Sequence, residues 1–140
     1  MFTKLSIILS DIKIEHTVFA LPFALMSAFL AAGGLPEMGK LVWILVCMVG
    51  ARSAAMAFNR IVDARYDAMN PRTRERAIPS GQVSVSSYWA FLILSSVLFV
   101  FSAWMLNKLA FYLSPVALTI VFFYSLTKRF AAFSHFWLGL

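Results

Sequence analysis

Long uncharged stretches alternate with short polar segments along this 140-residue chain. Residues 17–36, 77–107 and 109–127 contain no Asp, Glu, Lys or Arg, and residues 41–59 are interrupted only by Arg52. A helix that crosses a lipid bilayer needs roughly 20 predominantly apolar residues. The pattern therefore predicts an all-α fold, a polytopic transmembrane helical bundle of about four spans, with residues 130–140 as the start of a fifth.

The segment before the first span has a different pattern. In residues 1–15 isoleucines alternate with Lys4, Asp11 and Lys13, which predicts a short amphipathic helix in the membrane interface. The acidic residues Asp11 and Glu15 make this segment a poor signal peptide. We therefore expect residues 16–32 to be a permanent span, within one membrane domain that covers residues 1–140.

Turn-forming residues predict where the helices begin and end. Residues 33–36, Gly-Gly-Leu-Pro, form a turn signal after the first span. The second helix is predicted over residues 40–67 and should stop at Asn70, because a residue that precedes proline avoids the helical region. Ser84 or Ser86 is expected to cap the third helix. A polar segment over residues 59–81 therefore separates the second helix from the third.

Composition and charge agree with a membrane protein. Hydrophobic residues make up 61% of the chain and charged residues 13%, whereas a soluble domain carries about 25% charged residues. The net charge of +6 does not indicate a nucleic-acid partner here, because basic residues accumulate on the cytoplasmic side of membrane proteins. With four spans, the end that holds residues 59–76 is strongly basic, and the other end keeps only Lys40 and Lys108. We therefore expect residues 59–76 to face the cytoplasm.

Three oxygen-bearing side chains recur at every fourth position near the end of the second predicted helix. Asn59, Asp63 and Asp67 are spaced i, i+4 and i+8, so they form one stripe on the helix surface. Carboxylates at the end of a membrane helix are costly unless they are paired. Two interpretations remain open: ion pairs with Arg60 or Arg65, or a metal site.

Metal binding accounts for the regular register better than simple ion pairing does. Mg²⁺ takes one or two protein carboxylates and fills its remaining positions with water and substrate phosphates. Arginine is well suited to contacts with phosphate. Nearby lie Arg65, Arg72, Arg74 and Arg76. The acidic stripe and the basic loop together predict a diphosphate that is bridged to the protein by Mg²⁺.

The end of the fourth predicted span carries a second polar group. Tyr124 and Lys128 are spaced i, i+4, and Arg129 follows. Taken alone, this arrangement is typical of an interface aromatic residue followed by basic anchors on the cytoplasmic side.

Several strings, spread along the chain, resemble the UbiA-type membrane aromatic prenyltransferases of quinone biosynthesis, the 4-hydroxybenzoate polyprenyltransferase family. Residues 59–67 (NRIVDARYD) are followed by NPRT at residues 70–73 with RAIPSG at residues 76–81. Residues 124–129 (YSLTKR) resemble the next motif of the family, and residues 14–22 (IEHTVFALP) resemble the entry to its first span. The resemblance covers nearly the whole chain.

The resemblance implies a fold of usually nine spans around a central cavity, with two aspartate-rich motifs that hold Mg²⁺ on a prenyl diphosphate. Asn59, Asp63 and Asp67 match the first motif, and Arg60 stands where many relatives carry aspartate. The sequence contains no second acidic cluster, since its other acids are Asp11, Glu15, Glu37 and Glu75. We therefore expect these residues to form the N-terminal half of the fold and to be inactive by themselves.

The resemblance also implies the reaction and the residue roles. A polyprenyl group would pass from a polyprenyl diphosphate to an aromatic acid like 4-hydroxybenzoate, in a bacterial inner membrane and with Mg²⁺ as cofactor. Asn59, Asp63 and Asp67 would hold the metal, and the catalytic residues would be Asp63, Asp67 and Lys128. Arg52, deeper along the stripe, would contact the carboxylate of the acceptor. Diphosphate contacts are expected from Arg72, Arg76, Tyr124, Lys128 and Arg129.

Three other interpretations stay open at this stage. A dihydroxynaphthoate-type acceptor fits the same motifs. A truncated, non-catalytic membrane fragment fits the single acidic motif. Half of a transporter with an ion site at Asp63 and Asp67 is disfavoured, because transporters place broken or charged segments at the membrane centre, and these spans show only Arg52 there.

Overall fold

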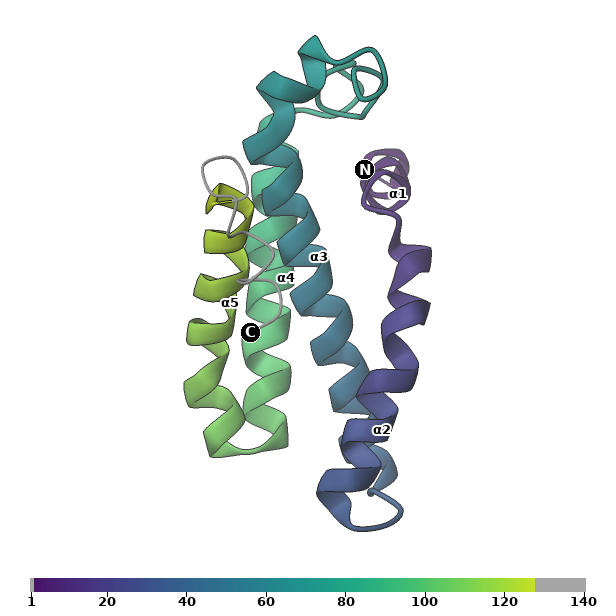
Figure 1. The fold of residues 1–140 in the computed structure, drawn as a ribbon, viewed down its shortest axis with the longest axis vertical. Helices are drawn as coiled ribbons and strands as arrows, with labels where there is room; N and C mark the ends of the chain where they lie inside the picture. Colours follow the sequence, from purple (N-terminus) through teal and green to yellow (C-terminus); the bar gives the residue numbers. More distant parts are fainter. Residues whose placement is uncertain (1, 128–140) are drawn as a thin grey trace.

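The computed structural model describes residues 2–127, and all of its secondary structure in that range is helical. The elements are α1 (Phe2–Asp11), the 3-10 helix η1 (Ile14–Ala20), α2 (Leu21–Ala32), α3 (Met38–Met69), α4 (Val85–Leu106) and α5 (Lys108–Thr127). Helices α2 to α5 run along the long axis of the molecule, and α3 lies between α2 and α5 (Figure 1). The all-α prediction is confirmed, and the expected start of a fifth span at residues 130–140 lies outside the described residues.

Among residues 2–127, three helices, α3, α4 and α5, are long and apolar enough to cross a membrane. The first predicted span is helical but shorter, and it consists of η1 followed by α2. Pro22 lies in the first turn of α2. Proline has no N–H group and is tolerated at the start of an α-helix rather than inside it. A single regular α-helix over residues 16–32 is therefore replaced by a 3-10 segment and a new α-helix that begins at Leu21.

The predicted turns lie at the observed helix ends. Gly33 ends α2 in the left-handed conformation, with φ 63°, which glycine adopts without steric cost. Asn70 ends α3 with an extended backbone, φ −101° and ψ 121°, as the following proline requires. Ser84, rather than Ser86, caps α4, because its Oγ accepts a hydrogen bond from the backbone N of Ser87 at 3.3 Å.

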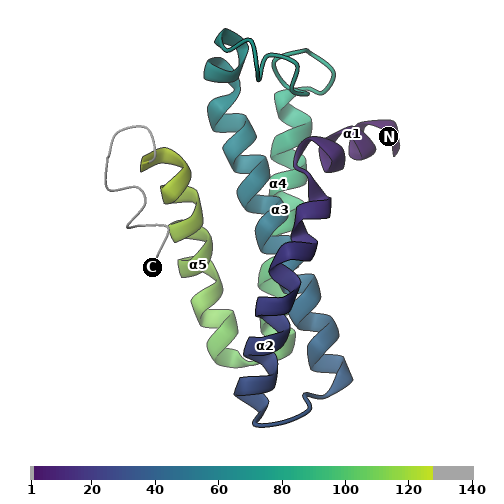
Figure 2. The same ribbon diagram turned by 45° about the vertical axis from the view of Figure 1, so that its right-hand side comes forward.

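Helix α1 crosses the direction of the other helices at one end of the molecule (Figure 2). Lys13, with φ 52°, turns the chain sharply between α1 and η1. The buried face of α1 carries Ile8 and Ile12, which pack in a cluster with Ala57 and Tyr88. Lys4 and Lys13 are exposed. Helix α1 therefore has one apolar, buried face and one charged, exposed face.

Helices α3 and α4 form the most closely packed pair. Ala54 and Ala57 are fully buried, and a Cβ placed on Gly50 would lie 3.1 Å from the backbone N of Phe99. Small residues of this kind allow membrane helices to approach backbone to backbone. Helix α3, which carries the polar stripe, is thus held firmly against α4.

Candidate functional site

The stripe predicted from the sequence lies on the last turns of α3. Asn59, Asp63 and Asp67 all fall within this one helix, so they keep their i, i+4 and i+8 register. At a rise of 1.5 Å per residue, the first and last of them are separated by about 12 Å along the axis. Asp67 is buried, and Asn59 and Asp63 are half-buried. The stripe is therefore partly shielded from solvent at one end of the bundle.

The carboxylate of Asp67 is held by an arginine of the following loop. Nη1 of Arg76 donates to both carboxylate oxygens, each at 2.7 Å. The hydroxyl of Thr73 donates to the backbone carbonyl of Asp67 at 3.1 Å. Ion pairs with Arg60 or Arg65 were one of the two interpretations left open by the sequence, whereas the observed partner of Asp67 is Arg76, nine residues along the chain. The Asp67 carboxylate thus stabilises a positively charged group beside it.

Local hydrogen bonds fold the loop back towards the end of α3. The side-chain oxygen of Asn70 accepts from the backbone N of Arg72 at 3.0 Å. The backbone carbonyl of Arg76 accepts from both the hydroxyl and the backbone N of Ser80, at 2.7 and 3.0 Å. The loop is anchored on its inner side by Ala77 and Val83, which are buried. These contacts direct Arg76 towards Asp67.

A second polar cluster joins α1, α3 and α4. Nε of Arg60 donates to Oδ2 of Asp11 at 3.1 Å, and Nη2 of Arg60 donates to the backbone carbonyl of Asp11 at 2.7 Å. The hydroxyl of Tyr88 donates to the same carboxylate oxygen at 2.6 Å. The sequence reasoning missed this cluster, although Arg60 had stood out as a departure from the family pattern. It fixes the face of α3 that lies beside the stripe.

Loss of Asp11 should measurably destabilise the protein. The side chains of Asp11 and Arg60 are only 11% and 10% exposed, so Asp11→Ala leaves a nearly buried guanidinium without its partner. Breaking such a pair costs about 3 kcal/mol, and the midpoint of thermal unfolding in detergent should fall accordingly. Glu37→Ala is the control, because the Glu37–Lys40 pair is exposed and such pairs contribute about 0–1 kcal/mol. Equal midpoints for the two variants would contradict the prediction.

Helix α5 packs against α3 close to the stripe. The rings of Phe58 and Phe122 pack with their centroids 4.7 Å apart. Phe58 precedes Asn59 directly, so this contact brings the end of α5 to the level of the stripe. Tyr124 is half-buried near that end. Lys128 and Arg129 lie outside the described residues.

Arg52 lies deeper in the bundle than the stripe. It is half-buried, and its Nε atom is buried without a hydrogen-bond partner in the described part of the chain. At 1.5 Å per residue it is about 10 Å from Asn59 along the axis of α3. An arginine within a membrane span is costly and is usually paired. Arg52 is therefore a donor that an acidic ligand would satisfy.

The stripe fits a hard divalent cation by its chemistry. It offers two carboxylates and one amide oxygen, and Mg²⁺ prefers oxygen ligands with water and phosphate in its remaining positions. Within residues 2–127 there is no group of three or more His, Cys, Asp or Glu that could hold a metal by themselves. The buried carboxylate of Asp67, already bound to a guanidinium, shows that this position accepts a cationic partner.

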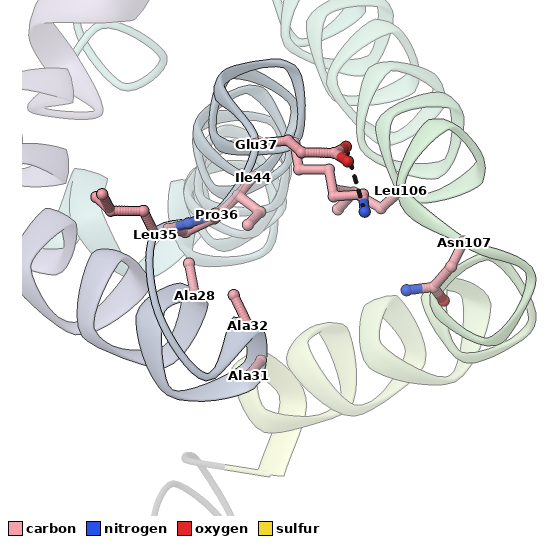
Figure 3. A pocket seen from close by; sticks show the side chains of 10 residues that line it. Ala28, Ala31, Ala32, Leu35, Pro36, Glu37, Ile44, Leu106 and Asn107 are labelled. Atoms are coloured by element: carbon pink, nitrogen blue, oxygen red, sulfur yellow. Dashed lines mark ion pairs between the residues drawn. The ribbon is translucent and has the colours of Figure 1, made fainter.

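A largely apolar cavity lies at the opposite end of the bundle. Its volume is about 550 Å³, and its walls include Ala28 and Ala32 of α2 and Leu106 of α4. In Figure 3 these side chains face a space that is bordered by the ion pair between Glu37 and Lys40, whose atoms are 3.3 Å apart. The rise of α3 separates Lys40 from Asp67 by about 40 Å, so this cavity is not part of the polar site.

Comparison with known proteins gives consistent matches. The model of the UbiA prenyltransferase family matches residues 20–140. Proteins named 4-hydroxybenzoate octaprenyltransferase from Shewanella woodyi and Vibrio atlanticus are 32% and 35% identical over 116 and 117 residues, which is 83% of this chain in each case. The chain spans 41% of the length of each of these two relatives.

A solved structure shows the same arrangement of helices. The apo structure of a UbiA homolog from Aeropyrum pernix K1 superposes with a TM-score of 0.83 at 38% sequence identity. The match covers 90% of this chain and 46% of that one. The described helices therefore follow a known arrangement over almost their full extent.

Proposed function

We infer, from the premise that this chain belongs to the UbiA prenyltransferase family, that it supplies the first half of an active site for polyprenyl transfer. The proposed donor is a polyprenyl diphosphate, and the proposed acceptor is an aromatic acid such as 4-hydroxybenzoate. The names of the relatives from Shewanella and Vibrio support this acceptor over a dihydroxynaphthoate. The observation that carries the proposal is the buried Asp67 carboxylate, which holds a cationic group beside a basic loop.

We assign the metal and diphosphate contacts as follows. Asn59, Asp63 and Asp67 would hold Mg²⁺, which when bound would supply positive charge that stabilises the leaving diphosphate. The arginines of the loop would add hydrogen bonds to phosphate oxygens, where guanidinium groups are effective. The residues proposed to contact the diphosphate are Arg72, Arg76, Tyr124, Lys128 and Arg129.

The acceptor would lie deeper, near Arg52. Its Nε atom is buried and has no partner in the described residues, and guanidinium groups form strong, often bidentate hydrogen bonds with carboxylates. Arg52 is separated from Asn59 by about 10 Å along the axis of α3. This distance leaves room for an allylic carbon between the diphosphate and an aromatic ring. The polyprenyl tail would lie against the apolar faces of the spans.

The site is proposed to face the cytoplasm of a bacterial inner membrane, because basic residues concentrate at its end of the bundle. In a Cys47→Ala background, which removes the single native cysteine, Thr73→Cys should react with an impermeant maleimide only after intact cells are permeabilised. Leu35→Cys, in the exposed turn at the opposite end, should react without permeabilisation. Strong labelling of Thr73→Cys in intact cells would contradict the orientation.

A chimera provides the direct test of the proposed reaction. Residues 1–140 would replace the matching segment of the Shewanella woodyi relative, and membranes would be assayed for Mg²⁺-dependent prenylation of 4-hydroxybenzoate. Product formation well above that of membranes without the chimera is expected. A chimera that is inserted and folded like its parent, yet forms no product with any aromatic acid, would contradict the proposed function.

A further inference from the structure

We propose that Arg76 is an internal counter-cation of Asp67, and that it leaves Asp67 for the diphosphate when a divalent metal ion arrives. Arg76 would then couple the two binding events, so that the site takes metal and diphosphate together. This inference rests on the function proposed above. A residue that only contacted phosphate would not couple the binding of metal to the binding of diphosphate in this way.

The geometry places the guanidinium where a metal ion would bind. A single nitrogen, Nη1, lies 2.7 Å from both carboxylate oxygens of Asp67. An ion that chelated both oxygens would occupy the position that this nitrogen holds. Like charges cannot share so small a space without a large electrostatic cost. Metal and Arg76 therefore compete for Asp67.

Burial explains why the Asp67 carboxylate needs a cationic partner, either Arg76 or a metal ion. The Asp67 side chain is 10% exposed, and an ionised carboxylate is costly in such a place without a compensating charge. The Arg76 side chain is 31% exposed, so its guanidinium can move towards solvent at smaller cost. When a metal ion satisfies Asp67, Arg76 becomes available to a phosphate group next to that ion.

The exchange has a thermodynamic consequence that is open to measurement. Each ligand removes an obstacle to the other: metal releases Arg76, and diphosphate draws Arg76 away from Asp67. Coupling between two sites is reciprocal and is typically worth about 5- to 150-fold in affinity. We expect metal to raise the affinity for diphosphate, and diphosphate to raise the affinity for metal, by about tenfold within this range.

Replacement of Arg76 separates this role from a simple phosphate contact. Arg76→Gln should bind Mn²⁺ alone about five- to tenfold more tightly than the unmodified chain, because the competitor is gone. The measurement is electron paramagnetic resonance titration of Mn²⁺ against the 140-residue chain in phosphatidylcholine nanodiscs. Arg74→Gln is the matched control, since it removes the same charge from the same loop at an exposed position. Mn²⁺ affinity in Arg76→Gln that equals or falls below that of Arg74→Gln would overturn the proposal.

A second pair of variants tests the exchange from the side of the anion. Without metal, Asp67→Asn should release Arg76 and raise the affinity for inorganic pyrophosphate by about fivefold relative to Asp63→Asn. Asp63→Asn removes the same charge from the neighbouring turn of α3. Calorimetric titration in EDTA gives both affinities. Equal pyrophosphate affinities in the two variants would overturn the exchange, even if Arg76→Gln did not fold.

The same titrations distinguish this inference from the proposed function. If the unmodified chain and all variants bind neither Mn²⁺ nor pyrophosphate, both proposals are wrong. If the unmodified chain binds both ligands, but Arg76→Gln and Asp67→Asn behave like their controls, only the counter-cation role is wrong. Tighter Mn²⁺ binding in Arg76→Gln supports the exchange.

Discussion

Asp63→Asn in the chimera should lower the rate of polyprenyl transfer by about a thousandfold, the loss expected when a group that stabilises transition-state charge is removed. The substitution keeps the size of the side chain and removes one of the two carboxylates of the stripe. The proposed metal clamp then loses a negative ligand, so less positive charge faces the leaving diphosphate. Asp67→Asn should have an effect of similar size. Initial rates at saturating Mg²⁺ provide the measurement.

The control for this experiment is the same chemical change at the other end of the bundle. Glu37 is exposed in the turn before α3, where it pairs only with Lys40 at 3.3 Å among the described residues. Glu37→Gln should retain full transfer activity. Circular dichroism should show unchanged helical content in all three variants. Full activity in both Asp63→Asn and Asp67→Asn would mean that the stripe has a structural role.

The 140 residues by themselves should form no detectable prenylated product. Within the described residues, the residues assigned to the proposed site come from α3, from the loop after it and from α5, and large apolar side chains remain exposed on α2 and α5, including Phe23 and Tyr112. In so open a site, water could reach the reactive allylic carbon and react with it in place of the aromatic acceptor. One acidic stripe also provides only part of the charge needed to hold a metal–diphosphate complex. We therefore expect the 140 residues to lose prenyl transfer but to keep part of their affinity for a prenyl diphosphate.

The assay uses the purified chain in nanodiscs with geranyl diphosphate, Mg²⁺ and 4-hydroxybenzoate, and the Shewanella woodyi relative as a positive control. Binding of geranyl diphosphate should remain measurable and should depend on Mg²⁺. Clear product formation by the 140 residues would refute both the incompleteness of the site and the requirement for a second acidic motif.

The sequence by itself determined the helical class, the turns that end α2 and α3, the start of α4 and the register of the stripe. Each of these depends on residues that are close along the chain. Gly33, Asn70 and Ser84 act through their own backbone preferences or through hydrogen bonds to residues a few positions away. Asn59 and Asp63 share a face because helix geometry places every fourth residue on one side. The family resemblance rests on the same local strings.

Only the tertiary structure decided which charges pair. Asp11 and Arg60 are separated by 49 residues, and Asp11 and Tyr88 by 77. Their contact exists because α1 folds across the bundle onto α3 and α4. The partner of Asp67 was likewise decided by the loop, which buries Ala77 and so brings Arg76 to the end of α3. Charge pairing follows distance in space, and that distance is set by packing between segments that a periodic pattern does not relate to one another.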